Sequence, residues 1–184
     1  KTATEEQMPN VAFLRTRIEF IDAFFGPGEV SEIWLTFSDP QLRGSENARL
    51  SSPLFLERYR HFLVPGGIIH LKTDSRYLYE YTKAVCRAND LPVFLSGTDI
   101  YRAGLDQVHP LFGPGPTLDV MAVFQVQTFY ESMFLEMGLP ITYLAFCIDH
   151  EGEYKFPGEA FDHEKWLEAE GPRRSFSHQP NKKG

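Results

Sequence analysis

Two apolar segments of this 184-residue chain each end in a carboxylate. The strand-forming run 33–37 is followed by Asp39 and by Pro40, which cannot continue a central strand. A second apolar run, 67–71, leads through two polar residues to Asp74. Ligands of open α/β sheets bind outside the carboxyl ends of the strands, so both acids are candidate site residues at one sheet edge. Turn capping is the alternative interpretation for either acid.

Apolar segments alternate with helical patterns along the chain, which indicates an α/β fold that would position these acids. We predict strands at 11–14, 33–37, 68–71, 92–95 and 141–148, and helices at 18–25, 52–63, 75–89 and 128–137. The Gly/Pro-rich segment 112–117 is expected to form a surface loop.

The length and the hydrophobic content of 42% suit one globular domain. From residue 149 onward the chain is polar, which favours an extended and partly ordered tail. We therefore predict a compact part at 1–150 and a polar C-terminal tail at 151–184.

Composition excludes several classes of protein. The chain has no apolar run of about 18 residues and no signal-peptide core, so we expect no membrane span and a cytoplasmic protein. A net charge of −7 argues against a strongly basic nucleic-acid binder, although a local basic patch stays open. Cys86 and Cys147 are interpreted as buried thiols. The histidines lack metal-ligand spacing, so no metal site is predicted, and His70 is interpreted as a packing residue.

Four motifs, in this order, resemble the bacterial single-subunit tRNA (guanine-N(7)-)-methyltransferases. They are Phe-Ser-Asp-Pro at 37–40, Arg-Leu-Ser-Ser-Pro-Leu-Phe-Leu-Glu-Arg-Tyr at 49–59, Leu-Lys-Thr-Asp at 71–74 and Thr-Phe-Tyr-Glu at 128–131. The resemblance covers residues 9–148. It implies a class I S-adenosylmethionine-dependent methyltransferase (Rossmann-like) fold, S-adenosylmethionine as cofactor, tRNA as substrate and N(7)-methylguanosine as product.

The glycine-rich turn by which such enzymes receive the cofactor is not recognisable in this chain. Gly26 and Gly28 follow a helical segment, and the glycines of 113–116 lie in an insertion. We therefore predict a C-terminal portion of a longer protein, lacking the N-terminal cofactor-binding strands and inactive by itself. The run 33–37 would then be an exposed apolar edge strand, prone to association with the missing N-terminal portion or with other chains.

The resemblance also implies roles for individual residues. Asp39 would lie between cofactor and substrate, as the catalytic residue and a cofactor contact. Arg17 would contact the cofactor, through its backbone if its side chain is unsuited, since relatives often carry an acid or amide there. The residues implied to bind the target nucleotide are Arg43, Asp74, Thr128 and Glu131. Plain surface charges are the alternative for Arg43 and Glu131.

The implied reaction sets modest chemical demands. Guanine N7 carries no proton, so no strong base is needed, and a carboxylate can stabilise the positive charge that develops on the base. Six arginines form a possible phosphate-facing set, with a solvated surface as the alternative: Arg15, Arg17, Arg43, Arg49, Arg58 and Arg60. Four tyrosines could stack on an extruded base, although helical spacing favours the core for three of them: Tyr77, Tyr79, Tyr81 and Tyr130.

Two other functions stay open at this point. The first is a methyltransferase of the same architecture that acts on another RNA or on a small molecule. The second is a non-catalytic RNA-binding scaffold, which the unrecognised cofactor turn favours. Binding of S-adenosylmethionine separates the scaffold from the enzymes.

Overall fold

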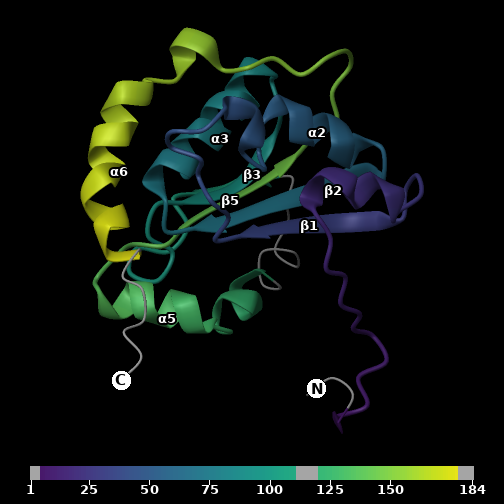
Figure 1. The fold of residues 1–184 in the computed structure, drawn as a ribbon, viewed down its shortest axis with the longest axis horizontal. Coiled ribbons are helices and arrows are strands. Elements are labelled where there is room, and N and C mark those ends of the chain that lie inside the picture. Colours follow the sequence, from purple (N-terminus) through teal and green to yellow (C-terminus); the bar gives the residue numbers. More distant parts are fainter. Residues whose placement is uncertain (1–4, 111–119, 178–184) are drawn as a thin grey trace.

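The computed structural model of the protein describes residues 5–110 and 120–177. Within them, the strands form one mixed sheet in the order β1-β2-β5-β3-β4 (Figure 1). The strands are β1 Val30–Thr36, β2 Leu63–Thr73, β3 Val93–Gly97, β4 Gln107–Val108 and β5 Thr142–Cys147. The predicted α/β fold is therefore confirmed as a mixed α/β sheet with helices on its two faces.

Helices α2 and α3 lie on one face of the sheet, and α5 lies on the other (Figure 1). The helical elements are η1 Ile18–Ala23, η2 Glu46–Ala48, α2 Pro53–Arg60, α3 Arg76–Ala88, α5 Phe129–Glu136, η4 Gly158–Ala160 and α6 His163–Ser177. Local sequence explains where two of them begin. Pro53 occupies the first turn of α2, where its missing N–H costs nothing, and the Ser75 hydroxyl caps α3 by accepting from the Leu78 N–H at 3.1 Å.

The sheet brings the ends of three strands to one edge. β1 and β2 are parallel, so both carboxyl ends lie there, whereas antiparallel β5 begins there, with Thr142 opposite Thr73. The Thr142 hydroxyl also donates to the Thr73 carbonyl at 2.8 Å. Segments that follow β1 and β2 and precede β5 therefore share this edge of the sheet.

The larger hydrophobic core lies between the sheet and helices α2 and α3. It takes Tyr77, Tyr79 and Tyr81 from α3, and all three have 0% exposure. Tyr130 is 66% exposed. The interpretation that three of these four tyrosines belong to the core is confirmed, and Tyr130 alone of the four presents its ring to solvent.

A smaller core lies on the α5 face, where Phe124 and Tyr143 pack edge to face with ring centroids 4.7 Å apart. Large apolar side chains stay exposed beside it, including Val126 at 71% and Phe129 at 76%. β1 is also incompletely covered, because within the described residues it pairs only with β2. The predicted apolar edge strand is thus confirmed for the described part of the chain.

A groove of about 380 Å³ runs beside this edge strand. Its walls come from η1 and β1 and from α2 and the residues that follow it, and they include Ile21, Phe25, Ile33, Ser38 and Phe62. Its lining is mainly apolar, as expected for an edge that another strand or chain segment would cover.

Several predicted elements differ in the structure. Residues 11–14 form no strand and pair with none of the described strands, and Phe13 there is 86% exposed. The helix predicted at 18–25 is the short 3-10 helix η1. Strand β4 and the helical turn at 120–124 were not predicted, and the predicted loop 112–117 lies outside the described residues.

The prediction of an extended tail is wrong for residues 158–177, which contain η4 and α6. Trp166 and Leu167 pack against the larger core, and Glu170 is buried. These few apolar residues dock α6 against α3. The polar composition of the segment as a whole does not reveal this packing. The division into a compact part and a tail stays a prediction.

The cysteines behave as interpreted. Cys86 and Cys147 are free and buried, and burial raises the pKa of both thiols, so neither favours a reactive thiolate. No described helix is long and apolar enough to span a membrane. The described residues also contain no cluster of three or more metal-ligating side chains.

Candidate functional site

The turn after β1 presents the first predicted acid. Phe37 and Gln41 have φ angles of 51° and 50°, a left-handed conformation that non-glycine residues adopt at a cost of roughly 1–3 kcal/mol. Two contacts support Phe37: its N–H donates to the Lys72 carbonyl at 2.9 Å, and its ring packs against Phe134. Asp39 lies exposed within the turn, and its Oδ1 accepts from the Gln41 N–H at 2.8 Å. One carboxylate oxygen of Asp39 thus fixes the turn that presents the other.

Arg49 holds this turn from behind. Its Nε donates to the Pro40 carbonyl at 3.1 Å, and Nη2 lies 3.4 Å from the Gln41 carbonyl and 2.7 Å from the Tyr77 hydroxyl. Arg49 is only 4% exposed. The interpretation of Arg49 as phosphate-facing is therefore wrong, because its guanidinium is buried and donates from Nε and Nη2 to the turn and to α3.

The second predicted acid follows β2 directly. Thr73 Oγ1 accepts from the Ser75 N–H at 3.0 Å, and Ser75 is the residue that caps α3. Asp74, half-buried between them, is therefore not the N-cap of that helix. Since Phe37 and Lys72 are hydrogen-bonded across the two strands, Asp39 and Asp74 lie on adjoining loops at the same edge of the sheet.

The first turn of α5 brings the third part of the site. Thr128 and Glu131 form a capping box: Thr128 Oγ1 accepts from the Glu131 N–H at 3.3 Å, and Glu131 Oε2 accepts from the Thr128 N–H at 3.2 Å. Glu131 Oε1 lies 2.6 Å from Lys72 Nζ, and both side chains are buried. The alternative of Glu131 as a solvated helix acid is thus wrong.

Sequence reasoning did not assign Lys72 to the site. Its ammonium lies 5.4 Å from the centre of the Tyr101 ring and 3.1 Å from the Tyr101 hydroxyl, which is itself 2.5 Å from Glu131 Oε1. Burial, followed by the hydrogen bond and charge of Glu131, raises the pKa of Tyr101, so its hydroxyl stays neutral. A lysine next to an apolar strand was the available signal, but its partner 59 positions away depends on the tertiary fold.

The remaining predicted residues lie further out. Arg43 is exposed in the loop that follows the Asp39 turn. Arg17 precedes η1, and its side chain, 73% exposed, reaches Glu19 at 3.4 Å and stands over the Phe20 ring. The structure thus holds the Thr128–Glu131 capping box against Lys72, near the end of β2 that Asp74 follows, with Asp39 and Arg43 on the next loop, while the described contacts of Arg17 are local.

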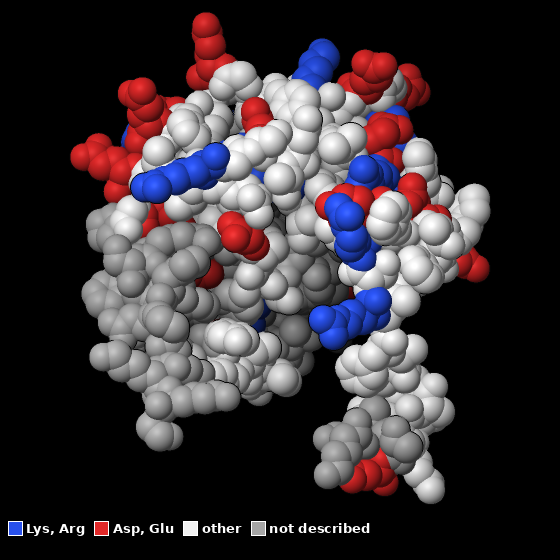
Figure 2. All heavy atoms as spheres, in the orientation of Figure 1, with Lys and Arg blue, Asp and Glu red and all other residues white. Residues whose placement is uncertain are grey.

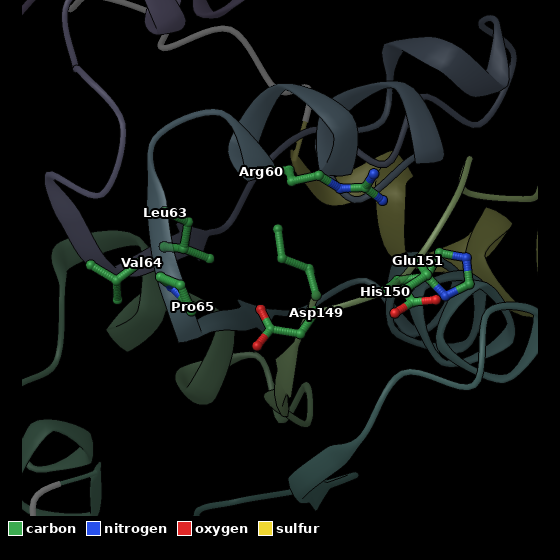
Figure 3. Close-up of a pocket in the computed structure, with 8 residues that line it drawn as sticks. Arg60, Leu63, Val64, Pro65, Asp149, His150 and Glu151 are labelled. Carbon is green, nitrogen blue, oxygen red and sulfur yellow. The ribbon is translucent and has the colours of Figure 1, made fainter.

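Charge is not concentrated on the face drawn in Figure 2, where Lys and Arg are interspersed with Asp and Glu. A pocket of about 460 Å³ lies elsewhere, where β2 begins and β5 ends (Figure 3). It is lined by Arg60, Leu63, Val64, Pro65, Ile148, Asp149, His150 and Glu151. Arg60, one of the six arginines considered for phosphate contact, lines this pocket, whereas none of the residues implied to be catalytic or to bind cofactor or target nucleotide does. The candidate site is therefore the opposite end of β2, where Asp39 and Asp74 lie.

His70 lies on the sheet face next to β1. It stacks on Trp34 with ring centroids 4.0 Å apart, and its Nδ1 lies 2.6 Å from the Tyr143 hydroxyl. Nε2 lies 3.4 Å from the Glu32 carboxylate, although it makes no aligned hydrogen bond. Burial lowers the pKa of His70 to about 4, against a smaller opposing effect of Glu32. The interpretation of His70 as a packing residue agrees with these contacts.

This burial predicts a specific acid sensitivity. The unfolded chain takes up the His70 proton near pH 6.5 and the folded chain only near pH 4, so His70 lowers stability as the pH falls between these values. Between pH 7 and pH 5 we expect a loss of about 2 kcal/mol from His70. Urea denaturation at both values should show this loss reduced in His70→Asn, whose amide oxygen can still accept from Tyr143. Exposed His61→Asn serves as the control, and equal losses in wild type and His70→Asn would contradict the prediction.

Comparison with known proteins identifies the family to which this chain belongs. A family model described as "Putative methyltransferase" matches residues 1–107. A tRNA (guanine-N(7)-)-methyltransferase of Bacteroides fragilis is 49% identical over 150 residues, covering 82% of this chain and 54% of the relative. The protein of that name from Bacteroides thetaiotaomicron is 47% identical over the same shares.

A third relative extends the similarity toward the C-terminus. The tRNA (guanine-N(7)-)-methyltransferase of Porphyromonas gingivalis is 40% identical over 176 residues, covering 95% of this chain and 66% of the relative. The chain spans about half the length of the first two curated relatives. The family resemblance predicted from the sequence is thus confirmed: the chain belongs to the "Putative methyltransferase" family, among relatives that are tRNA (guanine-N(7)-)-methyltransferases.

Proposed function

We propose that this chain provides the substrate-binding and catalytic part of a tRNA (guanine-N(7)-)-methyltransferase with a class I, Rossmann-like fold. The observation that carries the proposal is the convergence of Asp39, Asp74 and the Thr128–Glu131 capping box at one sheet edge in a chain of this family. The names of its relatives suggest the substrate and the position methylated.

Asp39 suits the chemistry of this transfer. Guanine N7 attacks through its own lone pair, so positive charge grows on the base, and a fixed carboxylate nearby stabilises that charge. Because Oδ1 of Asp39 is held by the Gln41 N–H, the position of the other oxygen is set before substrate arrives. S-adenosylmethionine would supply the electrophilic methyl group when bound.

The residues present fit that cofactor in part. Ser38 Oγ is buried without a hydrogen-bond partner among the described residues, and it lines the groove beside β1 next to Asp39. A polar group left unpaired at this place favours a ligand or a further chain segment there. We propose Asp39 as one cofactor contact. We propose Arg17, the residue directly before η1, as another, because η1 forms one wall of the groove.

The target nucleotide would meet the other loops of this edge. Asp74 offers a carboxylate to the donor groups of a guanine edge, and Arg43 offers a guanidinium to a phosphate. The Thr128 hydroxyl can donate to the nucleotide while its oxygen accepts from Glu131. Since Glu131 is wholly buried, we propose that it acts on the substrate by holding Thr128 in place.

Methyl transfer and cofactor binding test this function. Calorimetry with S-adenosylmethionine should show binding to the complete natural protein and none to this chain alone, and only the former should form N(7)-methylguanosine in tRNA. Methylation of another RNA, with tRNA unchanged, would move the protein to a different substrate. If neither form bound the cofactor, the enzyme hypothesis would fail in favour of an RNA-binding scaffold.

The exposed ring of Tyr130 predicts an effect on tRNA affinity. Tyr130 and its neighbour Phe129 project from the first turn of α5, between Thr128 and Glu131. Stacking of an unpaired base on an aromatic ring is worth about 1–3 kcal/mol, so Tyr130→Ala should weaken tRNA binding roughly tenfold in a filter-binding assay. Tyr130→Phe, which keeps the ring, should bind normally. Equal affinity of the alanine variant and wild type would remove Tyr130 from the interface.

A further inference from the structure

Tyr77 of α3 connects the C-terminal segment to Arg49, which in turn contacts the Asp39 turn. The hydroxyl of Tyr77 lies 2.7 Å from Arg49 Nη2 on one side and 2.6 Å from His163 Nδ1 on the other. His163 begins α6, which lies beside α3 (Figure 1). Segments 86 residues apart in the sequence therefore meet at a single hydroxyl group.

Chemistry fixes one hydrogen-bond direction in this chain of contacts: a guanidinium can only donate, so the Tyr77 oxygen accepts from Arg49. In the His163 tautomer that carries its proton on Nε2, the Tyr77 hydroxyl donates its own proton to Nδ1. Burial raises the pKa of Tyr77, which keeps this proton in place. In that tautomer the imidazole of His163 accepts from the Tyr77 hydroxyl and leaves the Tyr77 oxygen lone pairs facing Arg49.

Further contacts hold α3 and the C-terminal segment together at this place. The Tyr77 N–H donates to the buried Glu170 carboxylate at 3.2 Å. Phe161, just before α6, packs edge to face on the rings of Tyr77 and Tyr81, at 5.1 Å and 5.4 Å. The Arg49 guanidinium stands over the same two tyrosine rings.

Arg49 transmits this arrangement to the turn. It donates to the carbonyls of Pro40 and Gln41, the two residues that follow Asp39, and the Gln41 N–H fixes the Asp39 carboxylate. The turn contains a strained left-handed residue at Gln41, which persists only where surrounding contacts over-determine it. Arg49 supplies two of those contacts from a buried position.

We propose that Arg49 and Tyr77 are positioning residues for the Asp39 turn, and that α6 completes the device through His163. The C-terminal helix, which touches no predicted site residue in the described contacts, would thereby help to set the geometry of the catalytic carboxylate. The functional meaning of this positioning rests on the proposed methyltransferase activity, whereas the positioning itself can be measured without it.

Amide hydrogen exchange in the complete natural protein tests the positioning. Tyr77→Phe keeps the ring and removes the hydroxyl, so the Gln41 N–H should exchange about five- to tenfold faster, as expected for loss of one buried hydrogen bond. The Leu71 N–H in β2, which is paired on both sides, should keep its protection. Tyr79→Phe is the matched control, because the Tyr79 hydroxyl, on the same helix, has no hydrogen-bond partner among the described residues.

Variants of His163 test the part assigned to α6. His163→Ala should speed exchange at Gln41 as Tyr77→Phe does, whereas His163→Asn should restore it, since the asparagine Oδ1 takes the place of the imidazole Nδ1. Unchanged exchange at Gln41 in Tyr77→Phe, or an equal change in Tyr79→Phe or at Leu71, would overturn the proposal. The same result in His163→Asn and His163→Ala would overturn the role of α6.

Kinetics then connect the positioning to the reaction. In the complete protein, Tyr77→Phe should lower kcat for methyl transfer about tenfold at saturating tRNA and leave KM for tRNA within about twofold. A rise in KM alone would show that the turn binds tRNA without positioning the reacting groups, and would overturn the catalytic part of the proposal. If wild type transfers no methyl group, the proposed function fails, while the exchange results still decide the positioning.

Discussion

Asp39→Asn should lower methyl transfer to tRNA by about 100-fold or more in the complete natural protein, with the fold unchanged. Asparagine keeps an Oδ1 that can accept from the Gln41 N–H, so the turn after β1 should survive the substitution. What it loses is the negative charge, and removal of one pre-organised electrostatic group typically costs 10²–10³-fold in kcat. Single-turnover transfer of a labelled methyl group to tRNA measures this effect.

A second substitution at the same position separates charge from geometry. Asp39→Ala removes both the charge and the hydrogen bond to Gln41, so its loss should be at least as large as that of Asp39→Asn. If the asparagine variant were as active as wild type while the alanine variant was not, Asp39 would serve only to shape the turn. That outcome would favour the turn-capping interpretation that the sequence left open.

Glu131→Ala should destabilise the folded chain by about 4–6 kcal/mol. It leaves the Lys72 ammonium buried without its carboxylate, 2.6 Å away, and it also breaks the capping box of α5. Breaking a buried ion pair from one side typically costs about 3–5 kcal/mol, and loss of a cap contributes about 1 kcal/mol. Urea denaturation measures the change in the free energy of unfolding.

The double variant identifies the cause of that loss. Lys72→Met with Glu131→Leu replaces both charges by apolar side chains of similar size, so it should be less destabilised than Glu131→Ala alone. If the loss in the double variant equals the sum of the losses in Lys72→Met and Glu131→Leu, the two charges are not coupled. That result would contradict the coupling expected from their 2.6 Å separation. Exposed Glu136→Ala, on the same helix, should change stability by less than about 0.5 kcal/mol.

Several predictions that depended on local sequence agreed with the structure. The strands ending before Asp39 and Asp74, the Ser75 cap of α3 and the burial of three α3 tyrosines follow from periodicity and turn chemistry, which act within a few residues. The strand predicted at 11–14 failed although its residues are apolar, because a strand needs a partner.

The sequence by itself determined the α/β order, the four family motifs and the delivery of two acids to one sheet edge, because each is encoded in contiguous residues. Only the tertiary structure decided that Arg49 is buried behind the Asp39 turn, that Glu131 pairs with Lys72 and that α6 docks on α3. The hydrogen bonds of Tyr77 to Arg49, His163 and Glu170 join residues 28, 86 and 93 positions apart. Such pairs leave no local pattern, since the partner of a buried charge or hydroxyl is chosen by packing of the whole chain.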